Sequence, residues 1–164
     1  MGTAKSLLCT DREIADLYER HYQTLYRVCF MYMKNIADTE DAVQNTFINL
    51  IKNGKGFQNA EHEKAWLIRT AMNICKNSLK HWWRKRINLE DCGFLSIEPC
   101  FTIDETLEAV LGLPAKYKAV VYLYYYEGYK TAEIAGILHK PQSTVRNLLS
   151  EARQILKNKI GDNG

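Results

Sequence analysis

Long apolar runs are missing from this sequence of 164 residues. The longest run, Ala119–Tyr126, has eight residues, whereas a helix that crosses a bilayer needs about 20. The N-terminal segment MGTAKSLLCT also lacks the long apolar core of a secretory signal peptide. The sequence therefore predicts no direct insertion into a membrane and a protein that stays in the cytoplasm.

Paired cysteines and ligand clusters are missing as well. The five cysteines are an odd number, no two of them form a C-x-x-C pair, and the four histidines share no motif with them. This pattern favours small apolar side chains in a reducing compartment over disulfides or zinc ligands. The sequence also has no glycine-rich phosphate loop and no nucleophile–base motif. We therefore expect no catalytic site, no cofactor and no bound metal.

Helix breakers are scarce, because only three prolines occur and no segment is rich in glycine or serine. Helical spacing of apolar residues dominates, with one helix expected to begin at Asp38 and the next to run from Glu61 to Arg86. The segment Ala119–Tyr126 has the composition of a strand. No second strand exists to pair with it, so we interpret it as helix. The predicted fold class is all-α.

Charge is nearly balanced overall, at net +3, but it is unevenly distributed. Residues 1–60 are neutral, residues 61–86 carry net +5, and residues 111–164 carry net +4. Between the two basic regions, residues 87–110 hold six acidic residues and no basic one. Basic helical faces bind anions, most commonly nucleic acid, although an ordinary solvated face has the same composition.

The most specific local pattern is a helix-turn-helix at Thr131–Leu149. Ala135 suits the close crossing of two helices, and Val145, ten residues later, suits the contact between them. His139 occupies a turn position where glycine is frequent because φ is positive there. Pro141 cannot continue the first helix. The apolar core of the motif is predicted to contain Ile134, Leu138 and Leu148 or Leu149.

The second helix of this motif would present its first residues to DNA. Ser143 is expected to cap it, and Thr144, Arg146 and Asn147 follow. In the major groove, arginine binds guanine and asparagine binds adenine through two hydrogen bonds each. Basic residues farther along would meet phosphates: Arg153, Lys157 and Lys159. The alternative is an ordinary helical hairpin with a proline in its loop.

Five segments, in this order, resemble one protein family. They are Asp38–Phe47 (DTEDAVQNTF), Lys64–Asn73 (KAWLIRTAMN), Leu113–Lys118 (LPAKYK), Tyr126–Gly128 (YEG) and the helix-turn-helix. Together they resemble the bacterial RNA polymerase sigma factors of the extracytoplasmic-function (ECF) group. The resemblance implies a transcription initiation factor that binds core RNA polymerase and directs it to specific promoters.

The resemblance also implies roles for particular residues. The polymerase clamp would contact Asp38, Glu40, Asp41, Gln44, Asn45 and Phe47, although Phe47 also suits the core. The melted minus-ten element would be held by Arg69, Asn73, Lys76, Asn77, Lys80, Trp82, Trp83 and Arg84, with a flipped base in a pocket shared with the loop 54–63. Both Trp82 and Trp83 suit either base stacking or burial. The minus-thirty-five duplex would be read by Thr131, Ser143, Thr144, Arg146, Asn147 and Arg153.

A domain order and a set of partners follow from the same resemblance. Residues 1–86 would form sigma domain 2, residues 87–105 a flexible acidic linker, and residues 106–164 sigma domain 4. The implied partners are the clamp and flap regions of core RNA polymerase, promoter DNA and an anti-sigma factor. Three positions depart from the family pattern: Lys130, His139 and Leu148. Because Leu148 departs from the family pattern, the resemblance does not predict which promoter sequence is recognised.

Two other classes of protein compete with this interpretation. A stand-alone helix-turn-helix regulator would explain Thr131–Lys159, but not the acidic segment or the basic helix that holds all three tryptophans. Such a regulator would also need dimer symmetry to read a palindrome, and the sequence shows no dimerisation zipper. A small helical enzyme would need a motif that carries chemistry, and none is present. A sigma factor accounts for the helix-turn-helix, the basic helix and the acidic segment together, and the resemblance covers about Asp11 to Ile160.

Overall fold

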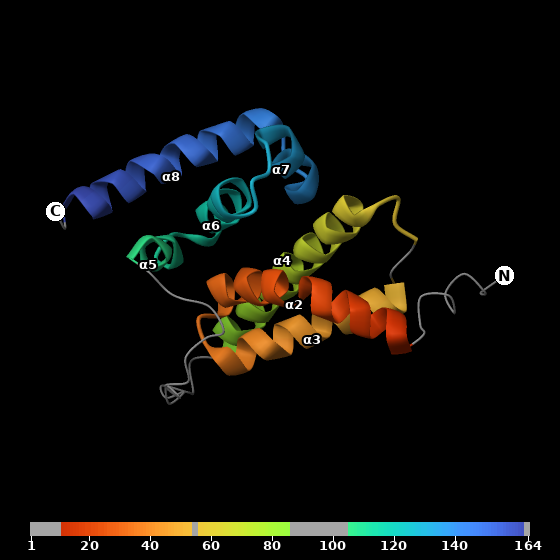
Figure 1. Cartoon of the computed structure of the whole chain (residues 1–164). Helices are drawn as coiled ribbons and strands as arrows, with labels where there is room; N and C mark the ends of the chain where they lie inside the picture. Colours follow the sequence, from red (N-terminus) through yellow and green to blue (C-terminus); the bar gives the residue numbers. More distant parts are fainter. Residues whose placement is uncertain (1–10, 54–55, 86–104, 163–164) are drawn as a thin grey trace. The chain divides into compact units, whose positions relative to one another are not determined.

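The computed structural model describes residues 11–53, 56–85 and 105–162. Every regular element in these ranges is helical, which confirms the all-α prediction (Figure 1). The chain divides into two compact units, Met1–Phe101 and Thr102–Gly164. None of the described helices is long and apolar enough to cross a membrane. Most of the predicted linker 87–105 lies outside the described residues.

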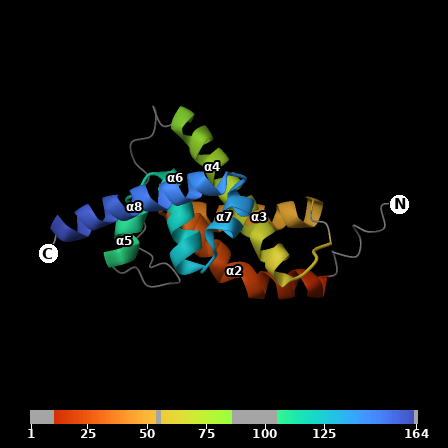
Figure 2. The same ribbon diagram turned by 90° about the horizontal axis from the view of Figure 1, so that it is seen from above.

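Three long helices build the first unit: α2 (Asp11–Met33), α3 (Ile36–Asn53) and α4 (Ala60–Lys85). Each packs against the other two (Figures 1 and 2). Each carries an apolar stripe at helical spacing, and the three stripes meet because burial removes them from water. The most deeply buried side chains of the three helices include Leu25, Val28, Val43, Ile68 and Met72.

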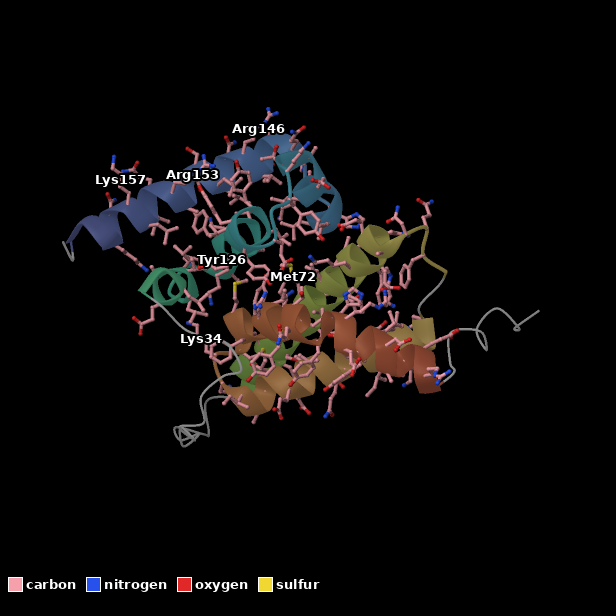
Figure 3. All side chains as sticks on the ribbon, in the orientation of Figure 1. Lys34, Met72, Tyr126, Arg146, Arg153 and Lys157 are labelled. Atoms are coloured by element: carbon pink, nitrogen blue, oxygen red, sulfur yellow. The ribbon has the colours of Figure 1, made fainter. Side chains whose placement is uncertain are left out.

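The junction between α2 and α3 corrects one predicted boundary. Lys34 adopts the left-handed region, with φ 62°, and ends α2 (Figure 3). Asn35 then caps α3, because its Oδ1 accepts the N–H of Asp38 at 2.8 Å. The Asn35 side chain also donates to Asp38 Oδ2 at 2.8 Å. The helix therefore begins at Ile36, and the prediction that it begins at Asp38 was wrong.

The second unit consists of α5 (Glu105–Leu111), α6 (Ala115–Val121), the π-helical turn η2 (Tyr122–Tyr126), α7 (Thr131–Leu138) and α8 (Gln142–Asp162). The sequence did not indicate α5, because it begins where the segment without a clear apolar period ends. Helix α6 continues directly into η2. The helix predicted over the tyrosine-rich segment is thus confirmed. Its second part, η2, is a single π-helical turn, which is the form in which π-helices mostly occur.

Helices α7 and α8 pack against each other as the predicted helix-turn-helix. Val145 is fully buried between them, as expected, together with Ile134 and Leu149. Leu138 was predicted in this core but is only half-buried, and Ile137 is buried in its place. Both Ile137 and Leu138 follow Ile134 on the same side of α7, three and four positions later, so the spacing alone did not decide which of them is buried.

The turn between the two helices has the predicted backbone. His139 is left-handed, with φ 53° and ψ 47°. The expected cap was wrong, however: α8 begins at Gln142, and Ser143 already lies inside the helix. The carbonyl of Pro141 accepts the N–H of Val145 at 3.2 Å, so Pro141 occupies the capping position. A proline fits there because its ring fixes φ and its missing N–H costs no helical hydrogen bond.

Replacing His139 with glycine is expected to stabilise the helix-turn-helix by about 0.5–1 kcal/mol. A β-carbon is strained at φ 53°, whereas glycine adopts this region freely. Hydrogen exchange of the Leu149 amide measures the effect, because this residue is buried in the motif. Lys140→Gly is the matched control: its φ is not positive, so glycine there gives no stabilisation. Faster exchange in His139→Gly than in wild type would contradict the prediction.

Candidate nucleic-acid interface

One face of α4 is polar and basic from Arg69 to Lys80. Five residues predicted to hold DNA recur there at intervals of three or four, so they share one side of the helix: Arg69, Asn73, Lys76, Asn77 and Lys80. All are exposed except Lys76, which is half-buried, while the opposite side of α4 lies in the core. The structure therefore brings these five together. The side chains of Trp82, Trp83 and Arg84 lie outside the described part of the structure.

An aromatic turn that the sequence pattern did not indicate leads into α4. The ring of Phe57 lies 5.8 Å from that of Trp66 and 5.5 Å from that of His62. Asn59 Oδ1 accepts the N–H of His62 at 2.8 Å and so caps α4. Of the predicted loop 54–63, residues 60–63 instead form the first turn of α4, and residues 56–59 are a bend whose Phe57 lies against that helix.

Glu63, in the first turn of α4, is anchored to α2. Its Oε1 accepts a hydrogen bond from Nε2 of His21 at 2.6 Å and pairs with Arg20 Nη1 at 3.2 Å. His21 is only 7% exposed, so this bond satisfies a polar group that water does not reach. His21 and Glu63 are 42 positions apart, so their bond fixes the start of the basic helix against α2.

A Glu63→Ala variant is expected to lower the free energy of unfolding of the first unit by about 1–3 kcal/mol, because buried His21 loses its partner. Tryptophan fluorescence during urea unfolding reports this unit, since all three tryptophans lie in α4. Glu61→Ala is the matched control: Glu61 is exposed in the same first turn and should leave the midpoint nearly unchanged. Equal midpoints for the two variants would show that the anchor contributes nothing.

The exposed face of α3 gathers most of the residues predicted to meet the polymerase. Five of the six are exposed: Asp38, Glu40, Asp41, Gln44 and Asn45. Phe47 is 5% exposed and lies against Tyr18 of α2 at 4.9 Å. It belongs to the core, as the alternative interpretation held. The sequence pattern did not single out Ile48, an apolar residue on this face that is 46% exposed.

The start of α8 presents the residues predicted to read duplex DNA. Ser143, Arg146 and Asn147 are exposed, and Thr144 is half-buried. Figure 3 shows Arg146 and Lys157 along the outer side of α8. Arg146 and Lys157 are separated by about three helical turns, so one face can meet both base edges and phosphates. Thr131 is half-buried at the start of α7.

Arg153, predicted to meet DNA, contacts tyrosines of η2. Its Nε donates to the hydroxyl of Tyr125 at 2.7 Å, and its guanidinium lies 5.5 Å from the ring centre of Tyr124. The hydrogen bond to Tyr125 raises the pKa of Arg153 above its ordinary value. The guanidinium therefore connects α8 to η2, and a contact with phosphate stays a prediction.

Two cysteines lie in the core of the first unit. Cys29 of α2 and Cys75 of α4 are free thiols with no exposed surface. A hydrogen bond with Cys75, and burial, raise the pKa of Cys29 far above its ordinary value. Burial also raises the pKa of neighbouring Tyr32. Within the described ranges, no group of three or more histidine, cysteine or acidic side chains is placed to hold a metal ion.

Comparisons with known proteins match both units. The model of the family "Sigma-70 region 2" matches residues 17–85, and that of "Sigma-70, region 4" matches residues 103–156. The chain is 31% identical to RNA polymerase sigma factor SigV of Bacillus subtilis, over 94% of this chain and 92% of that protein. It is 24% identical to ECF RNA polymerase sigma factor SigW of the same organism, over 90% and 89% respectively.

Two solved structures have a similar fold. The sigma factor RpoE, in complex with the anti-sigma factor NepR from Bartonella quintana, gives a TM-score of 0.71 at 17% identity, covering 89% of this chain and 97% of that chain. CnrH, in complex with the cytosolic domain of CnrY, gives 0.69 at 18% identity, covering 99% and 95%. These likenesses show the fold.

A helix-turn-helix in one unit and a basic helix in the other define a DNA-binding transcription protein. The two family matches, with the similarity to SigV along nearly the whole chain, narrow this class: the chain belongs to the sigma-70 family, in its ECF group. It is a transcription initiation factor that binds core RNA polymerase and directs it to promoters. A stand-alone regulator would have no region 2, so that alternative was wrong.

Proposed function

We propose that three exposed helix faces divide the work of promoter recognition. The face of α3 docks on the polymerase clamp, the face of α4 holds the melted minus-ten strand, and the start of α8 reads the minus-thirty-five duplex. The observation that carries this proposal is the face of α4, where five cationic or amide side chains align on one side of a helix. That helix begins beside the contact between Phe57 and Trp66.

On α4, the cations and the amides have separate tasks. Arg69 and Lys80 neutralise phosphates of one strand, while Asn73 and Asn77 hydrogen-bond to base edges. The Watson–Crick edges of the bases become accessible only after the strands separate, so contacts to them favour the melted state over the duplex. The flipped base sits beside the turn at Phe57, and Trp82 and Trp83 add stacking surfaces.

On α8, the first exposed residues carry sequence recognition. Arg146 and Asn147 bind base edges in the major groove, and Ser143 and Thr144 fix the helix against phosphates together with Thr131 of α7. Basic residues later in α8 add contacts that depend on salt but not on sequence. Recognition of the minus-thirty-five element thus depends on how α8 is held within its own unit.

We assign residues 1–86 to sigma domain 2, residues 87–105 to an acidic linker and residues 106–164 to sigma domain 4, which meets the polymerase flap. The six acidic residues of 87–110 suit channels that hold nucleic acid, so the linker occupies them until RNA displaces it. The chain performs no reaction itself, because the core enzyme makes phosphodiester bonds. We place the protein in the cytoplasm, where DNA and RNA polymerase are found.

An anti-sigma factor is the further partner that we propose. The similar structures of RpoE and CnrH were each solved with a second protein, NepR and the cytosolic domain of CnrY. Binding of such a protein would hold this chain away from polymerase until a signal releases it. Co-purification of the chain from its own cells, with and without core polymerase, tests whether a partner of this kind exists.

Transcription from a library of random promoters tests the whole proposal. The full chain is mixed with bacterial core RNA polymerase, and the start sites are sequenced. Discrete starts with two shared upstream elements are expected, about ten and thirty-five base pairs before the start. Starts without a shared upstream element, or no binding to core polymerase, would overturn the assignment of the three faces.

A further inference from the structure

One hydrogen bond joins the first residues of the two helices of the helix-turn-helix. Gln142, which begins α8, donates Nε2–H to Oγ1 of Thr131, which begins α7, at 2.9 Å. Both side chains are half-buried. Neither belongs to the apolar core that holds the rest of the motif, so this polar contact is a separate constraint on how the helices are placed.

The bond acts at the end of α8 that meets DNA. The turn after Leu138 connects the end of α7 to the start of α8, and the buried contacts of Val145 hold α8 farther along. Thr131 lies at the other end of α7, so the bond from Gln142 ties the start of α8 to that end as well. The exposed Arg146 follows one turn later on the same helix.

The bond also directs the hydroxyl of Thr131. A hydroxyl has one proton to donate and two acceptor positions. The amide of Gln142 uses one acceptor position, so the proton of Thr131 remains to donate to another oxygen, such as a DNA phosphate. The hydrogen bond would therefore have two effects: it would orient α8, and it would leave the hydroxyl proton of Thr131 in α7 able to donate to DNA.

We propose that Gln142 is a positioning residue for recognition of the minus-thirty-five element and acts through Thr131. This inference rests on the proposed reading of that element by α8. Gln142→Ala should lower the discrimination between an intact and a scrambled minus-thirty-five element by about five-fold, the value of one neutral hydrogen bond. Thr131→Val should lower this discrimination to a similar degree, because a contact from its hydroxyl to a phosphate does not depend on sequence. The double variant should be no worse than either single variant, because both remove the same bond.

Thr131→Ser is the rescue variant, because serine keeps the hydroxyl, and it should restore wild-type discrimination. Gln154→Ala is the matched control. Gln154 is an exposed glutamine of the same helix, and its amide contacts Asn158 one turn away at 3.5 Å. This control should discriminate as the wild type does. All variants are measured as full chains with core polymerase, on a promoter that the wild type selects, with melting temperatures in parallel.

Failure of this inference is separable from failure of the proposed function. A wild-type chain that ignores the minus-thirty-five element would overturn the role of α8 itself. If the wild type discriminates, three results would overturn the role of Gln142: unchanged discrimination in Gln142→Ala, single effects that multiply in the double variant, or equal losses on intact and scrambled templates. Non-additive losses with rescue by Thr131→Ser would establish it.

Discussion

An Arg146→Ala variant is expected to lose about ten-fold or more in discrimination for the minus-thirty-five element while keeping its fold. Arg146 is exposed near the start of α8. A guanidinium there makes two hydrogen bonds to a guanine edge, and a wrong base does not offer both acceptors. Because Arg146 takes no part in the core, the free energy of unfolding should change by no more than about 0.5 kcal/mol.

The measurement compares transcription by the holoenzyme from intact and altered minus-thirty-five sites. Lys157→Ala is the matched control, since Lys157 is exposed on the same face of α8 but farther from its start. This variant should weaken binding to both sites alike and reduce the dependence on salt, as loss of a phosphate contact does. If Arg146→Ala still discriminates as well as the wild type, Arg146 does not read a base.

An Asp41→Lys variant is expected to lower the affinity for core RNA polymerase by about ten-fold or more, because reversal of a charge turns an attraction across an interface into a repulsion. Asp41 is exposed on α3, among the acidic and amide side chains assigned to the clamp. The measurement is titration of core polymerase with a labelled chain at fixed salt. The variant leaves α8, which we propose reads the promoter, unchanged, so the loss should appear without DNA.

Asp16→Lys is the matched control for this variant. Asp16 is an equally exposed aspartate, but it lies on α2 and outside the clamp face. The two variants have the same net charge, so any general effect of charge on association is shared between them. Equal affinities of the two variants for core polymerase would contradict the assignment of the α3 face to the clamp.

The helices and their polar faces were predictable because they depend on short spacings. Residues three or four positions apart meet on one side of any α-helix, so the row from Arg69 to Lys80 on α4 could be read from the sequence. The left-handed turn at His139 was also predictable, because this position in the turn of a helix-turn-helix often has positive φ. The helix-turn-helix itself followed from the spacing of Ala135 and Val145.

Helix starts were less predictable, because several neighbouring residues can serve as caps. Asn35 caps α3, which was expected to begin at Asp38, and Pro141 caps α8 in place of Ser143. Acidic residues and serine favour the first turn generally, but only one residue per helix takes the capping geometry. The choice depends on how the preceding chain leaves the turn, as at Lys34 with its positive φ.

The sequence by itself determined the helical class, the helix-turn-helix and the faces that carry charge, since each depends on residues close together in the chain, within one helix or one short motif. Only the tertiary structure decided the contacts that hold those faces in place. Glu63 reaches His21 across 42 positions, Arg153 reaches Tyr125 across 28, and Gln142 reaches Thr131 across 11. Such pairs form because packing of apolar stripes brings the helices together first, and no local spacing specifies which polar side chains then meet.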